Sequence, residues 1–240
     1  MAKVKVSAGM VFERYEKKYR LSEEEYLQLM ERLNEYMQAD QYGKHTICSL
    51  YFDTKDYLLI RRSVEKPKYK EKLRLRSYGI PAPDTCVYLE LKKKLRGVTY
   101  KRRISMPYVE AQKYLLTGEQ PTDGGQILEE INYFRRQYQP VPKVLLFYER
   151  IALFGKEDPN LRVTFDTDIR YRTDDFDLSL GDEGTPLLQS GERLMEIKVS
   201  GALPFWLCRM LSELKIYPTS FSKYGTVYRK LLKEGISIAD

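Results

Sequence analysis

Long stretches of this sequence alternate, one residue at a time, between charged and apolar side chains, and this pattern restricts the fold more than any other feature. In residues 70–76 (KEKLRLR) every even-numbered position is basic, while Leu73 and Leu75 take odd positions. Because successive side chains of a β-strand point to opposite faces of a sheet, such a stretch predicts a strand with one charged and one apolar face. Alternation of this kind predicts eight strands, at residues 12–21, 46–53, 69–78, 86–95, 98–106, 143–154, 161–172 and 193–200.

Between these strands, apolar residues recur every three or four positions, which is the spacing of one face of an α-helix. Ser22 followed by Glu25 is a capping box, a typical helix start. The spacing predicts helices at residues 22–39, 56–64, 107–116, 125–138, 204–214 and 222–233. Together the elements predict an α+β protein: a mainly antiparallel eight-stranded β-barrel with peripheral helices, since eight strands are enough to close a barrel.

The chain is expected to form a single domain over residues 1–240, because it contains neither internal repeats nor a Pro/Gly/Ser-rich linker. Its three cysteines, Cys48, Cys86 and Cys208, are far apart, and His45 is its single histidine. These counts disfavour a disulfide scaffold, a cysteine-based zinc site and any mechanism that needs two histidines. The first residues lack the apolar region of a secretion signal, so we expect a cytoplasmic location.

Positive charge is concentrated in one part of the chain. Between Arg61 and Arg103 there are fifteen lysines and arginines but four acidic residues, so the local net charge of +11 exceeds the +7 of the whole chain. Such a concentration implies a polyanionic partner, because the opposing charge relieves self-repulsion. Nucleic acids, anionic lipid headgroups and phosphate compounds all fit this description.

The charged strand faces are compatible with two architectures, between which the pattern alone does not decide. In the first, the apolar face of the sheet packs on a core and the charged face is solvated. In the second, the charged faces line the inside of a barrel and the apolar faces pack outward against helices. A charged interior is unfavourable unless a polyanion, or ordered water and ions, fills it. The heavy use of arginine suits bidentate binding of phosphate.

Short motifs along the chain resemble those of a known family. They are EKKY at 16–19, SLYFDT at 49–54, KLRLRSYG at 72–79, LELK at 89–92, YER at 148–150, RVTFD at 162–166, LMEIK at 194–198 and SFSKY at 220–224. In this order they are similar to the VTC domain, the polyphosphate polymerase domain of the vacuolar transporter chaperone, in the CYTH-like triphosphate tunnel superfamily. The resemblance extends from about residue 10 to residue 233.

This resemblance implies an antiparallel barrel that forms a tunnel lined with basic residues. It also implies an enzyme that transfers the γ-phosphate of ATP to a polyphosphate chain with the help of Mn²⁺ or Mg²⁺. The expected partners are therefore ATP and inorganic polyphosphate, without nucleic acid, and any membrane-protein partner would lie outside this chain.

The resemblance and the strand faces together select the candidate site residues. The expected catalytic residues are Arg74, Arg76, Arg150, Arg162 and Lys223. The expected phosphate-binding residues are Lys18, Lys72, Lys92, Lys101, Arg103 and Lys198. The expected metal ligands are Glu196, Glu90 and Glu16.

The chemistry of phosphoryl transfer fits these residue types, because it needs mainly positioning and neutralisation of charge. Arg74 and Arg76, two residues apart on one strand, can each clamp a phosphate through two parallel N–H bonds. Glu196, between apolar neighbours, can offer its carboxylate to a hard divalent cation. By alternation Asp166 and Asp168 share a face with the basic residues of their strand, and we expect them to orient arginines rather than hold metal.

One position departs from the family pattern. Ser220 stands where the eukaryotic polymerases have a second lysine, three residues before the one that matches Lys223. A polymerase is the leading hypothesis, and a metal-dependent tripolyphosphatase and a non-catalytic polyphosphate-binding module stay open as alternatives. Nucleic-acid binding would need exposed aromatic residues among the basic ones, for which Tyr78 and Tyr100 are the candidates.

Overall fold

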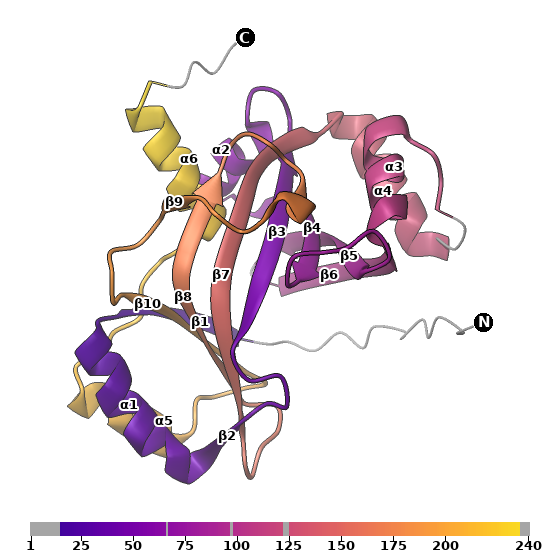
Figure 1. Cartoon of the computed structure of the whole chain (residues 1–240). Coiled ribbons are helices and arrows are strands. Elements are labelled where there is room, and N and C mark those ends of the chain that lie inside the picture. The colour runs from indigo at the N-terminus through magenta and orange to yellow at the C-terminus, as the bar shows by residue number, and fades with distance from the viewer. Residues whose placement is uncertain (1–14, 66, 97, 122–124, 236–240) are drawn as a thin grey trace.

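The computed structural model describes residues 15–65, 67–96, 98–121 and 125–235. Figure 1 shows the arrangement of the secondary-structure elements. Their order is β1 (Tyr15–Leu21), α1 (Glu23–Tyr36), β2 (Met37–Ala39), β3 (His45–Asp53), α2 (Leu58–Val64), β4 (Tyr69–Tyr78), β5 (Cys86–Leu95), β6 (Val98–Pro107), α3 (Tyr108–Thr117), α4 (Gly125–Tyr138), β7 (Val141–Gly155), β8 (Arg162–Arg172), a short 3₁₀ helix (Leu178–Leu180), β9 (Thr185–Pro186), β10 (Arg193–Val199), α5 (Phe205–Glu213) and α6 (Lys223–Lys233).

The predicted strands and helices are all present, with ends that differ by a few residues at most. Residues 12–14 of the first predicted strand lie outside the described residues. The capping box is confirmed, since Ser22 Oγ accepts a hydrogen bond from Glu25 N at 3.1 Å while Glu25 accepts one from Ser22 N. The helix that follows ends at Tyr36, not at residue 39, because Met37–Ala39 pairs with β7 as a strand. The two short strands β2 and β9 were not predicted, because two or three residues carry too little alternation.

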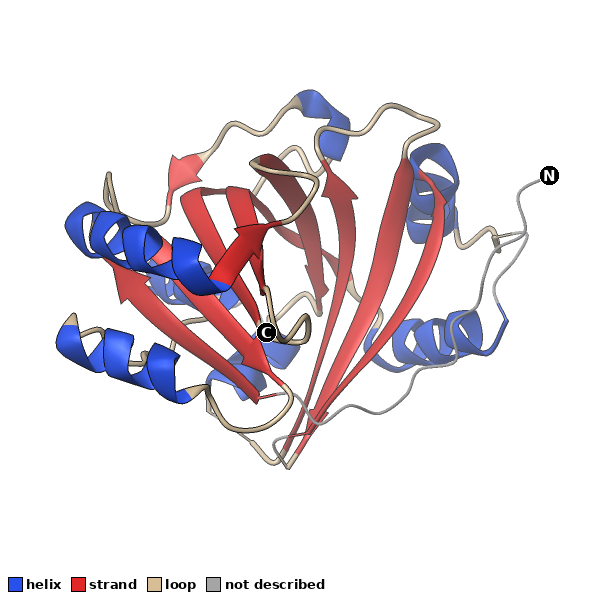
Figure 2. Cartoon of the chain, turned by 90° about the horizontal axis from the view of Figure 1, so that it is seen from below, coloured by secondary structure: helices blue, strands red, loops and turns tan. Residues whose placement is uncertain are grey.

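The strands form one antiparallel sheet with the order β1-β10-β8-β7-β3-β4-β5-β6, to which β2 and β9 add at the side. The fold is therefore α+β, as the alternation predicted. Among the described residues β1 and β6 are the two edges of this order, so the sheet is barrel-like without being closed by hydrogen bonds. Figure 2 shows the strands curving around a common centre.

A contact between distant strands shows which face of the sheet is concave. Lys92 on β5 and Glu16 on β1 are six strand positions apart in the sheet order, yet Lys92 Nζ lies 3.8 Å from Glu16 Oε2. In a flat sheet these strands would be about 29 Å apart, at roughly 4.8 Å per strand. The sheet therefore curls with its charged face inward.

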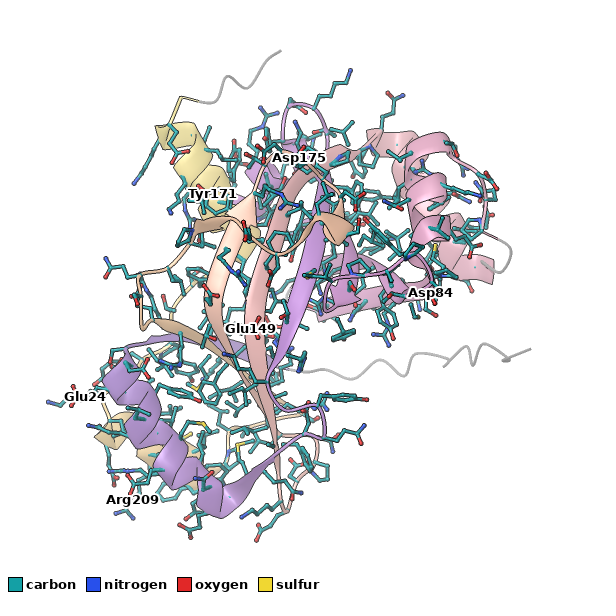
Figure 3. All side chains as sticks on the ribbon, viewed as in Figure 1. Glu24, Asp84, Glu149, Tyr171, Asp175 and Arg209 are labelled. Atoms are coloured by element: carbon teal, nitrogen blue, oxygen red, sulfur yellow. The ribbon has the colours of Figure 1, made fainter. Side chains whose placement is uncertain are left out.

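The outer, convex face carries two apolar cores. In one, α1 and α5 cover β1, β8 and β10; in the other, α3 and α4 cover strands β3 to β7. Leu73 and Leu75, which alternate with the basic residues of β4, are buried in the second core. Charged residues of α1 and α5, such as Glu24 and Arg209, point away from the sheet (Figure 3). The second architecture, with apolar faces outward, is thus the one that forms.

Two helices depart from the peripheral position expected of them. Helices α2 and α6 pack against Tyr51 of β3, Leu146 of β7 and Ile169 of β8 in a third apolar core. Tyr51 pairs with Arg74 across β3 and β4, so this core occupies part of the charged, inner face. As a result, α6 begins directly beside the charged side chains.

The alternation on β8 is interrupted, which corrects part of the predicted charged face. The register between β7 and β8 shifts by one residue between Phe147 and Glu149, and Asp168 there has a left-handed backbone with φ of 48°. Beyond this bulge Ile169 points inward, into the third apolar core. Arg170 faces outward, opposite Phe147. Asp168 and the arginines that follow it therefore do not share the face of Arg162, because a bulge reverses the side-chain alternation.

Candidate active site on the inner face of the sheet

The candidate site lies on the concave face, and we refer to its charged residues as the basic inner face. Its cations are Lys18, Lys72, Arg74, Arg76, Lys92, Lys101, Arg103, Arg150, Arg162, Lys198 and Lys223. Its carboxylates are Glu16, Glu90, Asp166 and Glu196. Every residue expected to be catalytic, phosphate-binding or metal-ligating lies on this face, whereas Asp168 does not, and the cations far outnumber the carboxylates. The individual roles of these residues stay predictions.

Glu90 holds together one group of cations on β4, β5 and β6. Its carboxylate lies 2.6 Å from Arg74 Nη2, 2.5 Å from Lys101 Nζ and 4.0 Å from Arg76 Nε. Burial of Glu90, which is 1% exposed, would raise its pKa, but the three cations outweigh this effect and lower the pKa to about 2. Glu90 is therefore ionised and positions these side chains, while an excess of positive charge remains.

Asp166 holds a second group, formed by β7, β8 and α6. Arg150 donates two parallel hydrogen bonds to its carboxylate, at 2.6 and 2.8 Å, and Lys223 Nζ lies 2.5 Å from it. Asp166 is fully buried, which would raise its pKa, but Lys223 and Arg150 outweigh burial and lower it. Asp166 thus orients Arg150, as predicted for this residue, and also fixes the lysine that opens α6.

The segment before α6 is held by two further lysines of the basic inner face. Lys18 Nζ of β1 donates a hydrogen bond to Phe221 O at 3.2 Å, and Lys72 Nζ of β4 donates one to Ser222 Oγ at 3.4 Å. Ser222 also caps the helix, accepting from Gly225 N at 3.2 Å. The helix N-terminus and the lysine at its first position therefore face the same charged region as the strands.

Two of the predicted metal ligands lie around one ammonium group. Lys18 Nζ is 3.4 Å from Glu16 and 4.0 Å from Glu196, which is itself 2.7 Å from Lys198. Burial would lower the pKa of Lys18, but Glu196 and Glu16 outweigh it and raise the pKa. The carboxylates of Glu16 and Glu196 therefore stabilise a positive charge at the position of Lys18 Nζ.

The described residues include no cluster of three or more His, Cys, Asp or Glu side chains that could hold a metal by themselves. A Mg²⁺ ion bound through one or two carboxylates and the oxygens of a phosphate substrate needs no such cluster. Glu196 and Glu16 fit that type of site. Glu90, the third expected metal ligand, is already contacted by Arg74 at 2.6 Å and by Lys101 at 2.5 Å, and its metal role stays a prediction.

Two tyrosines join the site without having been predicted. Arg74 Nη1 donates to the hydroxyl of Tyr51 at 2.9 Å, and Arg76 Nη2 donates to that of Tyr148 at 3.2 Å. Burial would raise the pKa of Tyr51, but Arg74, Arg76 and Lys72 outweigh it and lower the pKa to about 7. In the alternation both tyrosines count as apolar, so the sequence could have indicated them only if the strand pairing had been known.

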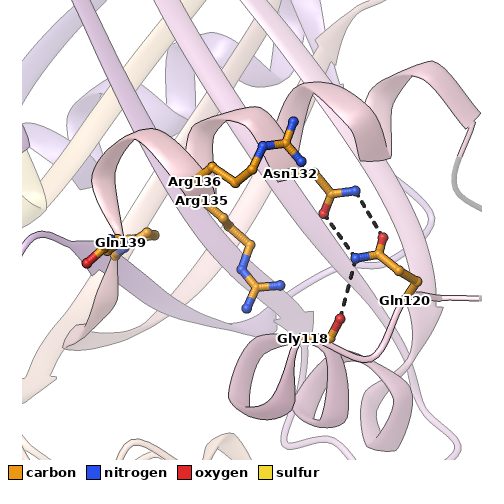
Figure 4. Close-up of a pocket in the computed structure, with 7 residues that line it drawn as sticks. Gly118, Gln120, Asn132, Arg135, Arg136 and Gln139 are labelled. Atoms are coloured by element: carbon orange, nitrogen blue, oxygen red, sulfur yellow. Dashed lines mark hydrogen bonds between the residues drawn. The ribbon is translucent and has the colours of Figure 1, made fainter.

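A pocket of about 450 Å³ lies elsewhere, against α3 and α4 (Figure 4). It is lined by Gly118, Gln120, Asn132, Arg135, Arg136, Gln139 and Pro140. None of the predicted site residues lines it. The candidate site therefore rests on the convergence of charge on the inner face and not on this pocket.

Polyphosphate, the partner expected from the sequence, should bind the basic inner face less tightly as pH rises above 8. Burial lowers the pKa of Lys72 and of Lys101 to about 8. Both are charged below that pH and lose their charge above it, whereas the internal phosphates of a long chain stay anionic. Between pH 7 and pH 9 the Kd of long-chain polyphosphate, measured by calorimetry, should rise at least about tenfold, the effect of losing one proton needed for binding.

A variant tests whether the lysines cause this dependence. In Lys72→Arg the guanidinium stays protonated throughout this range, so the rise in Kd between pH 7 and pH 9 should become smaller. A wild-type Kd that stays constant from pH 7 to pH 9 would contradict the assignment.

A family model described as VTC domain matches residues 13–232 of the chain. Among solved structures, a Bacillus halodurans protein, a proposed adenylate cyclase, is similar over 86% of this chain and 92% of its own, with 15% identity and a TM-score of 0.54. A Hippeastrum protein, a proposed adenylyl cyclase with a dominant triphosphatase activity, has 18% identity over 93% and 97% of the two chains and a TM-score of 0.46. The first similarity supports the fold. The sequence has no significant match among curated proteins.

Proposed function

Since the chain belongs to the VTC domain family, we propose that it transfers the γ-phosphate of ATP to a polyphosphate chain, with Mn²⁺ or Mg²⁺ as the metal. The observation that supports this proposal is the excess of cations on the basic inner face, which come from strands at both ends of the sheet and from α6. A ligand with several linked phosphates is long enough to contact cations all along this face, whereas a single phosphate contacts only a few of these cations.

The transfer forms one P–O bond and breaks another. A terminal oxygen of the polyphosphate chain attacks the γ-phosphorus, the bond to the β,γ-bridging oxygen breaks, and ADP leaves with the electron pair. The attacking oxygen is already anionic, so the reaction needs no strong general base. The protein therefore acts mainly by binding and orienting phosphates, which agrees with a site made of arginines and lysines.

In the proposed reaction, different residues bind the phosphates, neutralise their charge and hold the metal. Arg74 binds oxygens of the transferred phosphate and Arg76 binds those of the adjoining phosphates of the donor, while Glu90 keeps both guanidinium groups in place. Arg150 and Lys223, positioned by Asp166, neutralise charge from the opposite side of the basic inner face. Glu196 and Glu16 would hold the divalent cation, whose contribution is to neutralise phosphate oxygens.

A tripolyphosphatase is the second candidate, in which water replaces the polyphosphate chain as acceptor. Ser220 favours it, because this exposed residue immediately precedes the segment held by Lys18 and Lys72 and stands in place of the second lysine of the polymerase pattern. One fewer cation there weakens the binding of an acceptor chain. A non-catalytic polyphosphate-binding module is the third possibility.

One assay separates these functions. The protein is incubated with ATP and Mn²⁺, and ADP, free phosphate and chain products are quantified together. We expect ADP with an equal amount of phosphate in chains. ADP with free phosphate would contradict the polymerase and identify a hydrolase. Tight binding of ATP or polyphosphate without turnover would identify a non-catalytic binding module.

Three further predictions concern the surroundings of the protein. No described helix is long and apolar enough to cross a membrane. The cytoplasmic location, a membrane-protein partner outside this chain and the lack of nucleic-acid binding stay predictions.

A further inference from the structure

A row of aromatic side chains crosses one end of the inner face. Tyr42, His45, Tyr78 and Tyr88 follow one another with ring centroids 6.3, 6.0 and 5.6 Å apart, and we refer to them as the aromatic row. The guanidinium carbon of Arg103 lies 4.4 Å from the ring centroid of Tyr88. The row thus combines stacking surfaces with a cation.

The aromatic row directly continues the basic inner face. Along β4 the inward positions are occupied by Lys72, Arg74, Arg76 and then Tyr78, at intervals of about 7 Å. Tyr88 pairs with Arg76 across β4 and β5. A ligand whose phosphates contact Arg74 and Arg76 therefore has its next group beside Tyr78 and Tyr88.

Packing within the protein does not account for these aromatic side chains. None of the four belongs to the three apolar cores of the described residues. Tyr78 is 48% exposed and Tyr42 is 69% exposed. Exposed aromatic rings beside a phosphate-binding surface are the arrangement that binds a base, since every base offers a flat π-face.

We propose that the aromatic row binds the base of the nucleoside triphosphate that donates the phosphate, with Tyr78 and Tyr88 as stacking surfaces. The inference rests on the proposed function, because it needs a nucleotide donor. The triphosphate then extends along β4 from Arg76 toward Lys72, so that the γ-phosphate points away from the base and toward the segment before α6. Stacking also tolerates different bases, so ATP and GTP should bind with similar affinity.

The test compares ATP with tripolyphosphate, which lacks the base, by calorimetric titration of the whole chain. In Tyr78→Ala the affinity for ATP should fall about tenfold, the typical effect of losing one stacked base, while the affinity for tripolyphosphate stays within about twofold. Tyr78→Phe, which keeps the ring, should restore the affinity for ATP. Tyr133→Ala, a change of a more exposed tyrosine on α4, serves as the control and should alter neither affinity.

The outcomes separate this inference from the proposed function. Equal losses for both ligands in Tyr78→Ala, or no loss for either, would overturn the base-binding role while the phosphate site stands. A wild-type chain that binds neither ligand would overturn the proposed function and this inference with it.

Discussion

Replacing Arg74 with alanine should abolish the synthesis of polyphosphate while the protein stays folded. Arg74 joins Glu90 to Tyr51 at the centre of the basic inner face, where it can contact the transferred phosphate. Loss of one such donor typically lowers the rate about a thousandfold. The fold should persist, because Leu73 and Leu75 on the same strand still fill the outer core. The rate of ADP release and the length of the chain products measure the effect, and circular dichroism measures the fold.

A matched change on the other face serves as the control. Arg102 lies on β6 with its guanidinium 3.4 Å from Glu130 of α4, on the outer side of the sheet. Arg102→Ala removes the same charge from the chain but should change the rate less than about twofold, because this side chain points away from the basic inner face. The fold should persist, since an exposed ion pair contributes about 1 kcal/mol or less to the free energy of unfolding. If Arg74→Ala turns over ATP at the wild-type rate, the central role given to this arginine is wrong.

Replacing Asp166 with asparagine should both destabilise the protein and inactivate it. The change leaves Arg150 and Lys223 without their buried counter-charge. Breaking a buried ion pair in this way costs about 3–5 kcal/mol of the free energy of unfolding, which chemical denaturation can measure. Activity should fall as well, because the two cations lose the orientation that Asp166 imposes on them.

A polyanion should partly reverse this loss of stability. When tripolyphosphate supplies the missing negative charge, the rise in Tm that it causes should be larger for Asp166→Asn than for the wild type. In Asp182→Asn, which breaks a partly exposed pair with Arg170 at 3.0 Å, the unfolding free energy should change by about 1 kcal/mol or less. A variant Asp166→Asn that is as stable as the wild type would show that the buried cluster does not hold these cations.

The strands and the membership of the charged face could be predicted from local pattern. Alternation placed β4 and β5 at their observed ends and assigned Arg74, Arg76 and Glu90 to one face. This succeeds because the side-chain period of a strand is two and depends on neighbouring residues alone. The same reasoning failed on β8 beyond Asp168, where a bulge that local pattern does not signal reversed the alternation.

The sequence thus determined which residues lie in strands, which of them share a face, and how strongly positive that face is. The tertiary structure decided that this face is the concave one, that Lys92 of β5 meets Glu16 of β1, and that α6 brings Lys223 to Asp166. It also decided that Tyr51 and Tyr148 become partners of the arginines. The physical reason is that alternation is a property of adjacent residues. The curvature of the sheet and the closeness of distant charges instead arise from the twist of all strands together and from the faces that the helices cover.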